Sequence, residues 1–345
     1  MNAVFPLALA ALAIPPLAGR ALGGKPPKPL PALAALAPVA TVPAVAALVL
    51  AATYAWWLAV LLAIPAAVLA AWQLPHRRRP HGPGASRPPR RPDAELAGPC
   101  IKLLTLNALY GKASADIIVR RVRDDLVDVL TVQELTVGLA RRLADAGLDE
   151  LLPFGEMHVP PGHPGTGIWS RWPMRPVPPV PGLASPTPRV TIVVAGRSVT
   201  VTAVHLLTPL HGRVRAWQRE LGQLASTLAA TAGAQLVAGD FNATRDHRPF
   251  RRLLDGGFDD CADTACKRRW PGFTWPAFAW PASFLPGARP GLPLMRLDHV
   301  LATRGNFYVR ASRTMRFPGT DHRGVLTIVQ LRQDGDTDHG SQALP

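Results

Sequence analysis

Apolar and polar positions divide the chain into contrasting regions. Residues 29–75 contain no charged residue and no histidine, and they are followed by a stretch rich in arginine, proline and glycine. Beyond it, short apolar runs alternate with segments whose apolar residues recur at helical spacing. The predicted division is a hydrophobic membrane-anchor region at 1–75, a basic linker at 76–99, a folded domain at 100–333 and a disordered tail at 334–345.

The uncharged stretch is long enough for two membrane spans of about 20 residues each. Tyr54, Trp56 and Trp57 gather near its middle, and such aromatic residues suit a membrane interface. The expected spans are at 32–51 and 56–72, and residues 1–19 would form a third span or a truncated one. Basic residues flank the pair on both sides, so the positive-inside rule would place both flanks in the cytoplasm.

The folded domain mixes predicted hairpins with predicted helices. Strands are expected at 101–106 and 127–132 with a helix near 115–126 between them, and a Gly-containing turn joins two further strands as a hairpin. An amphipathic helix follows the hairpin, because apolar residues recur at helical spacing from Val214 to Leu228. Later strands are expected at 235–238, 297–302 and 325–331. This mixture predicts α+β layers rather than a purely parallel sheet.

Composition excludes several classes of protein. Apolar residues make up 48% of the 345 residues, enough for a sizeable core, so the chain is not disordered throughout. Three cysteines and no repeat exclude collagen-like, coiled-coil and disulfide-rich scaffolds. The net charge of +15 favours a polyanionic partner such as nucleic acid or an anionic lipid surface. A generally basic proteome would explain the same charge.

Polar residues follow or end several of the predicted apolar strands. These groups are Asn107, Gln133-Glu134, His205, Asp240-Phe241-Asn242, Asp298-His299 and Asp321-His322. Taken singly, each has an ordinary structural explanation, such as a strand cap, an Asx turn or a hydrogen-bonded core histidine. Taken together, carboxylates, carboxamides and imidazoles at the ends of six strands predict one convergent site.

These residue types indicate a definite chemistry. Glutamate, aspartate and asparagine offer hard oxygen ligands that suit Mg²⁺ or Mn²⁺, whereas no Cys/His cluster has zinc spacing. A hard divalent cation beside histidines suits the hydrolysis of phosphate esters. A histidine–aspartate pair can activate water, and asparagines can hold phosphoryl oxygens as charge develops.

The polar residues lie in an ordered series of motifs between residues 100 and 332. The series is Thr105-Leu106-Asn107, Val132-Gln133-Glu134, Gly167-Ile168-Trp169-Ser170-Arg171, Ala203-Val204-His205, Gly239-Asp240-Phe241-Asn242, Arg296-Leu297-Asp298-His299 and Thr320-Asp321-His322. In this order it resembles the endonuclease/exonuclease/phosphatase superfamily, which includes the deoxyribonuclease I, exonuclease III and neutral sphingomyelinase groups. The resemblance implies an α/β fold, a four-layer sandwich of two packed mixed sheets flanked by helices, here preceded by N-terminal transmembrane helices.

The resemblance also implies roles for individual residues. Glu134 would be the principal metal ligand, with Asn107 and Asp321 near the ion. The catalytic residues would be His205, Asp240, Asn242, Asp298 and His322, of which His205 and Asn242 would also contact the substrate. His322, oriented by Asp298, would contact the phosphate or act as base, and the group that deprotonates water stays open.

Several features of the domain lie outside the motif pattern. Thr320 stands where serine is commoner in the family, and Tyr110 stands near a position where many members carry a second asparagine. His299 should point to the face of its strand opposite Asp298. The stretch 267–284 interleaves cations, aromatics and prolines, which suits nucleic-acid stacking, a membrane interface or a loop that covers the sheet edge.

The predicted activity is divalent-metal-dependent phosphoester hydrolysis by a membrane-tethered enzyme of the phosphodiesterase or nuclease type. The alternatives are a lipid or small-molecule phosphoesterase, like a sphingomyelinase or a phosphoinositide phosphatase, and a catalytically idle binding module. The expected partners are a nucleic-acid or phospholipid substrate and membrane lipids around the spans, with no obligate protein partner evident. The predicted location is a multi-pass cell-membrane protein with its catalytic domain on the extracytoplasmic side, where a Cys261–Cys266 disulfide is feasible.

Overall fold

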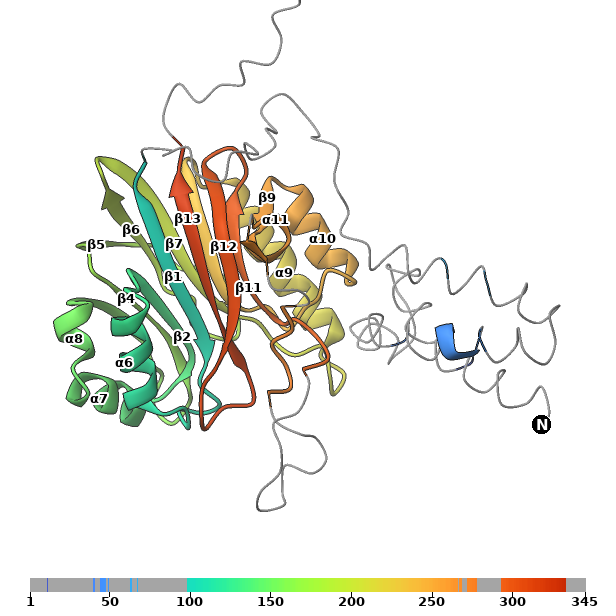
Figure 1. The fold of residues 1–345 in the computed structure, drawn as a ribbon, viewed down its shortest axis with the longest axis horizontal. Coiled ribbons are helices and arrows are strands. Elements are labelled where there is room, and N and C mark those ends of the chain that lie inside the picture. Colours follow the sequence, from blue (N-terminus) through green and yellow to red (C-terminus); the bar gives the residue numbers. More distant parts are fainter. Residues whose placement is uncertain are drawn as a thin grey trace, which may run out of the picture.

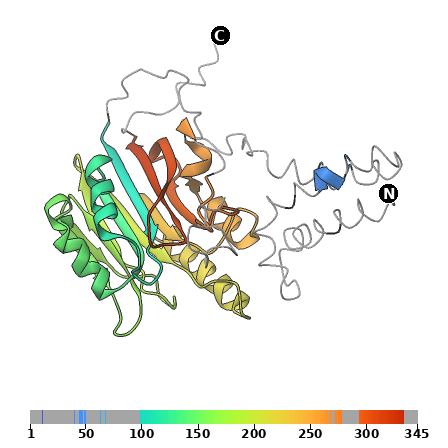
Figure 2. The same ribbon diagram turned by 60° about the horizontal axis from the view of Figure 1, so that its bottom comes forward.

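The structure, a computed structural model, describes residues 98–332 except 266, 269–271 and 278–292, together with isolated positions before residue 98. In this part of the chain, two mixed β-sheets pack face to face, and helices cover the outer face of each sheet (Figures 1 and 2). The predicted four-layer α/β sandwich of two packed sheets is therefore confirmed.

One sheet has seven strands in the order β10-β12-β13-β1-β2-β4-β3. Its centre is the parallel pair of β1 and β2, and the strands on either side of that pair run antiparallel to it. The strands are β1 (Cys100–Asn107), β2 (Val129–Leu135), β3 (Phe154–His158), β4 (Gly165–Ser170), β10 (Lys267–Arg268), β12 (Phe307–Arg316) and β13 (Arg323–Leu331).

The other sheet has six strands in the order β5-β6-β7-β8-β11-β9. β7 and β8 form its parallel pair, and β11 lies antiparallel beside β8. The strands are β5 (Met174–Val177), β6 (Arg189–Val194), β7 (Arg197–His205), β8 (Ala234–Asp240), β9 (Phe258–Asp260) and β11 (Asp298–Thr303). β6 and β7 form the predicted hairpin.

The helices supply the two outer layers. Those on the seven-stranded sheet are α6 (Ala115–Asp124), α7 (Val137–Asp145) and α8 (Leu148–Leu151), and those on the six-stranded sheet are α9 (Val214–Ala229) and α10 (Arg248–Asp255), while the short α11 (Cys261–Thr264) follows β9. Ser114 and Thr136 cap α6 and α7, because each side chain accepts a hydrogen bond from a backbone N–H of the first turn. α9 buries Trp217, Leu221 and Leu224 at helical spacing against its sheet.

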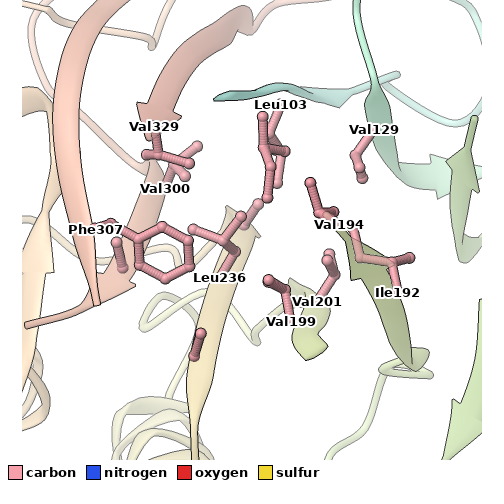
Figure 3. Packing of buried hydrophobic residues seen from close by; sticks show 14 of the residues in the cluster. Leu103, Val129, Ile192, Val194, Val199, Val201, Leu236, Val300, Phe307 and Val329 are labelled. Atoms are coloured by element: carbon pink, nitrogen blue, oxygen red, sulfur yellow. The ribbon is translucent and has the colours of Figure 1, made fainter. Parts of the chain in front are cut away.

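Strand alternation divides the core into three apolar layers. In β1, Leu103 points into the layer between the sheets, whereas Leu104 points to the helices outside. Figure 3 shows the inner layer, in which Leu103 and Val129 of one sheet face Val201 and Leu236 of the other. Burial of such a side chain contributes roughly 1.5–3 kcal/mol, so this inner layer is what holds the two sheets together.

The predicted membrane location is wrong. A span needs about 20 consecutive apolar residues in a helix, and in the described part of the chain no helix has the length and apolar character to cross a membrane. The predicted spans at 32–51 and 56–72 lie outside the described residues apart from isolated positions, as do the linker apart from its last residues and the tail at 334–345. Cys261 is a free, buried thiol, so it forms no disulfide.

The contact between β7 and β8 is unusually close at Gly239, directly before Asp240. Gly239 pairs with Val204 and has φ of +146°, a conformation that side chains with a Cβ rarely adopt. A Cβ at this position would lie 1.9 Å from the carbonyl oxygen of Val204. Only glycine therefore fits at this position, directly before the last residue of β8.

We expect Gly239→Ala to lower the free energy of unfolding by about 3 kcal/mol, because the new methyl group forces the two strands apart. Gly196→Ala is the matched control: Gly196 has φ of +81°, but no atom lies within 4 Å of its Cβ position. That control should cost only about 1 kcal/mol. Urea denaturation of both variants measures the difference, and equal losses would contradict this account of the strand contact.

Candidate active site

Polar side chains replace apolar ones at one end of the layer between the sheets. In β8 the inward-facing core residues are followed, at the strand's last position, by Asp240. The same alternation turns Asn107 at the end of β1, His205 at the end of β7 and Asp298 at the start of β11 into this layer. The register pairs Asp240 with His205 on one side and with Asp298 on the other, which places three of these residues side by side.

The carboxylate of Asp240 is the centre of the site. Its side chain is 2% exposed. Oδ1 accepts a hydrogen bond of 2.8 Å from the backbone N–H of Asn242, and Oδ2 accepts one of 3.1 Å from Nδ2 of Asn107. The Nε2 atoms of His322 and His205 lie 3.9 and 4.0 Å from the same Oδ2. One buried carboxylate therefore connects residues from both sheets.

Glu134 extends this network on the seven-stranded sheet. Nδ2 of Asn107 donates to Oε1 of Glu134 over 3.0 Å, and the backbone N–H of Tyr110 donates to Oε2 over 2.8 Å. Nε2 of His205 lies 3.8 Å from Oε1. The Glu134 carboxylate is thus fixed by two donors on β1 and the loop that follows it, beside an imidazole of the opposite sheet.

A bulge in β2 turns Glu134 toward the site. Gln133 occupies an inward position, where its side chain accepts a hydrogen bond from Thr105, so strict alternation would direct Glu134 to the outer face. Instead, Glu134 has φ of +52°, and the register with β4 shifts between Gln133 and Leu135. A bulge of this kind re-aims a side chain, and here it brings the carboxylate into the inner layer.

His322 and Asp298 form a buried pair. Nδ1 of His322 lies 2.8 Å from Oδ2 of Asp298, whose side chain is fully buried. Burial by itself lowers the pKa of His322, but the charge and hydrogen bond of Asp298, with the charges of Asp240 and Asp321, outweigh it and raise this pKa to about 10. Burial, opposed by the nearby imidazoles, raises the pKa of Asp240. Nδ1 of His322 therefore donates to Asp298, and Nε2 is left facing Asp240.

Asp321 lies beside His322, on the segment before β13. Its Oδ2 accepts a hydrogen bond of 3.0 Å from Nε1 of Trp275, and its Oδ1 lies 4.0 Å from Nε2 of His322. Thr320 donates a 2.7 Å hydrogen bond to the carbonyl of Asn107 and accepts one from the backbone N–H of His322. The threonine hydroxyl therefore joins the end of β1 to the segment before β13, and a serine hydroxyl at this position could make the same two hydrogen bonds.

Asn242 adopts φ of +47° and donates from Nδ2 to the carbonyl oxygen of Leu206 over 2.8 Å. This bond ties the residue after β7 to the turn after β8. Asn242 thus holds both segments that frame Asp240. The strained backbone at Asn242 is maintained because these contacts over-determine it.

Two supporting residues were not predicted from the sequence. Oγ1 of Thr274 accepts hydrogen bonds from the backbone N–H groups of Leu297 and Asp298 and so fixes the start of β11. Trp275 orients Asp321, as described above. Both lie in the segment where cations, aromatics and prolines alternate, and a threonine there carries no motif that marks it. For Trp275, the only signal in the sequence was that it is one of several aromatic residues in this segment.

The structure brings the eight predicted site residues together, since each contacts at least one other member of the set through the distances given above. His299 lies apart from them. Its Nδ1 is 2.8 Å from Oδ2 of Asp260, and its Nε2 is 2.9 Å from the carbonyl oxygen of Ala243. It therefore lies on the opposite face of β11 from Asp298, as alternation predicts.

The donor set suits a hard divalent cation. Glu134 and Asp321 offer carboxylate oxygens, and Asn107 offers a carboxamide. Among the described residues, Oδ1 of Asp298 and Oδ1 of Asp321 are buried without a hydrogen-bond partner, a deficit that a bound cation can relieve. Asp240, Asp298 and His322 also place ligand atoms within 4.8 Å of one another. Glu134 and Asn107 lie next to this group, in the same hydrogen-bond network around Asp240.

Comparisons with known proteins agree with this geometry. The family model described as the Endonuclease/Exonuclease/phosphatase family matches residues 104–322. Among the curated proteins, no significant match was found.

Many solved structures share the fold. D. rerio TDP2 complexed with a single-strand DNA product is 14% identical, with 67% of this chain and 98% of that chain covered and a TM-score of 0.54. Truncated Caenorhabditis elegans TDP2 is 15% identical, with coverage of 68% and 98% and a TM-score of 0.53. An endonuclease/exonuclease/phosphatase family protein from Bacteroides thetaiotaomicron is 13% identical, with coverage of 69% and 100% and a TM-score of 0.52.

At these identities, likeness to solved structures shows the fold alone. The family match is stronger, because it spans more than half of the chain and extends over every residue of the predicted site, from Asn107 to His322. The chain belongs to the endonuclease/exonuclease/phosphatase family.

Proposed function

We propose that this chain is a divalent-metal-dependent phosphodiesterase of the nuclease type, which hydrolyses phosphodiester bonds of nucleic acid. The observation that carries the proposal is the buried Asp240 carboxylate, which accepts a hydrogen bond from Asn107 and is flanked by the imidazoles of His205 and His322. Family membership supports hydrolysis of a phosphate ester. The excess of basic residues and the DNA product in the structure of D. rerio TDP2 support a nucleic-acid substrate.

Asn107 and Glu134, with Asp321 nearby, would hold Mg²⁺ or Mn²⁺. Such a cation supplies positive charge that polarises phosphoryl oxygens and stabilises the leaving oxygen. The hydrogen bonds of Tyr110 and Asn107 fix the Glu134 carboxylate before the cation binds, so little ordering of this side chain is required. A fixed ligand of this kind also holds the substrate phosphate in a constant position relative to the other residues.

Asp240 is the side chain best suited to accept the proton of the attacking water. Burial raises its pKa, which makes its carboxylate a stronger base than an exposed aspartate. The backbone N–H of Asn242 holds Oδ1, so Oδ2 is the oxygen that faces the imidazoles. In this arrangement Asn242 orients the base and the turn that carries it.

The two imidazoles supply positive charge and protons on either side of Asp240. Asp298 holds Nδ1 of His322, which leaves Nε2 to donate a hydrogen bond to a phosphoryl oxygen as negative charge develops there. His205 has its Nε2 between Glu134 and Asp240 and can contact the phosphate or donate a proton to the leaving oxygen. A binding module that does no chemistry would not require these paired histidines and carboxylates.

Loss of the proposed metal ligand should strongly reduce activity. We expect Glu134→Gln to lower turnover roughly 100- to 1000-fold, because the charge that holds the cation is removed. The substrates are plasmid DNA, single-stranded RNA, sphingomyelin, phosphoinositides and bis-p-nitrophenyl phosphate, each assayed with the full-length chain in Mg²⁺, Mn²⁺ or EDTA. Calorimetric titration with Mn²⁺ should show weaker binding by the variant.

Glu150→Gln serves as the control, since it makes the same change on an exposed helix. Near-normal turnover or unchanged Mn²⁺ affinity in Glu134→Gln would refute the assigned role of Glu134. Hydrolysis of a lipid ester in preference to nucleic acid would show that the proposed substrate class is wrong, while the chemistry would stand.

The His322–Asp298 pair should be visible in a titration of protein freed of metal by EDTA. Asp298, Asp240 and Asp321 all face His322, so its imidazolium should persist to a pH of about 10. Because this pKa is raised on folding, the pair stabilises the fold fully below about pH 6.5, and that stabilisation is lost as the pH rises toward about 10. Asp298→Asn should lower the pKa of His322 markedly, which NMR of the imidazole protons measures. An unchanged titration would show that Asp298 does not hold this ring.

A further inference from the structure

One aromatic side chain stands in solvent directly beside the proposed metal ligand. Tyr110 is 62% exposed, although its backbone N–H is bonded to Oε2 of Glu134 over 2.8 Å. With an N–Cα bond of about 1.5 Å, its Cα lies at most about 4.3 Å from this oxygen. The exposed side chain of Tyr110 is therefore attached to the backbone next to Glu134.

The backbone around Tyr110 is strained. Leu109, Tyr110 and Gly111 have φ values of +46°, +51° and +70°, so three consecutive residues adopt the left-handed conformation. Residues with a Cβ avoid this conformation, and strain of this kind is concentrated at active sites and ligand clamps. The strained turn sets the position from which the ring projects.

Contacts on all sides hold this turn in place. The carbonyl oxygen of Ala108 accepts hydrogen bonds from the N–H groups of Lys112 and Ala113, at 2.9 and 3.0 Å. Nη2 of Arg142 donates to the carbonyl oxygen of Gly111 over 2.6 Å. A Cβ at Gly111 would lie 2.2 Å from Oγ1 of Thr136, so the turn packs closely against the start of α7. The backbone is fixed, whereas the ring of Tyr110 stays open to solvent.

We propose that the ring of Tyr110 is a stacking platform for a nucleobase next to the scissile phosphate. The proposal rests on the nuclease-type function proposed above and deepens it, because it assigns substrate recognition to a residue outside the motif set. Every nucleobase has a flat π face, so stacking on an aromatic side chain is favourable whichever base is present. Because the backbone of the turn is already fixed, stacking needs to order only the side chain of Tyr110, which limits the entropy lost on binding.

Exposure alone does not carry this proposal, since isolated apolar side chains are common on protein surfaces. Leu126 illustrates the difference. It is 60% exposed and has φ of +53°, but it precedes β2 and so lies at the strand's opposite end from Glu134. Tyr110 combines the same exposure and strain with a direct hydrogen bond to a proposed metal ligand.

The test compares two single-stranded substrates of equal length, one an oligothymidylate and the other an oligomer of base-free tetrahydrofuran phosphodiester units. The full-length chain is assayed with Mn²⁺. We expect the wild-type KM to be about 5- to 150-fold lower for the oligothymidylate than for the base-free oligomer. Tyr110→Ala should bring the ratio of the two KM values close to one, because only the oligothymidylate loses a stacking contact. The Tyr110→Ala backbone N–H can still donate to Glu134, and a general change in activity affects both oligomers and cancels in this ratio.

Two further variants separate stacking from general damage. Tyr110→Phe keeps the ring and should retain the preference, and Leu126→Ala should behave as the wild type does. If the wild type cleaves both oligomers and Tyr110→Ala keeps its preference for the oligothymidylate, the stacking proposal is overturned while the proposed function stands. If the wild type cleaves neither oligomer, the nucleic-acid substrate is wrong, and the stacking proposal falls with it.

Discussion

The burial of the Asp240 carboxylate between two sheets is the constraint on which the rest of the site depends. An ionised carboxylate in an apolar layer is costly by several kcal/mol unless it is hydrogen-bonded and paired. Its partners come from separate elements: Asn107 ends β1, His205 ends β7, and His322 precedes β13. These partners meet only when the two sheets pack in one alignment. The apolar inner layer holds the sheets together. The hydrogen bonds and charge pairs at the polar end of that layer form in only one relative alignment of the two sheets.

Local strain near the site follows from the same arrangement. Glu134, Asn242 and Tyr110 are residues with a Cβ at positive φ, and each lies in or beside the network around Asp240. Conformations of this kind cost of order 1 kcal/mol or more each, so they persist only where other contacts fix them. Asn107, at the end of the neighbouring strand β1, donates a hydrogen bond to Glu134, and Asn242 donates one to the carbonyl oxygen of Leu206, just after the neighbouring strand β7. Stability of the surrounding sandwich is therefore what maintains the geometry of the site.

The pattern of the sequence predicted the central strands well and the outer ones poorly. β1, β2, β7 and β8 are largely buried on both faces, and their clusters of apolar residues, interrupted mainly by threonine, are visible without a structure. β3, β5 and β12 are largely exposed or only partly buried, and their polar residues hide them from a hydrophobicity pattern. At the N-terminus, long uncharged stretches predicted membrane spans; those stretches lie outside the described residues apart from isolated positions, and the described helices include none that could cross a bilayer.

The sequence by itself determined which polar residues end the inner layer, because period-two alternation places the last polar residue of a buried strand on the same face as the core residues before it. That rule suffices for Asn107, His205 and Asp240. It fails for Glu134, whose bulge reverses the alternation, and it is silent on Thr274, which acts through a hydrogen bond to a strand far away in the chain. Only the tertiary structure decided these contacts, since a distance between strand ends depends on how two sheets pack and not on the spacing of residues along one strand.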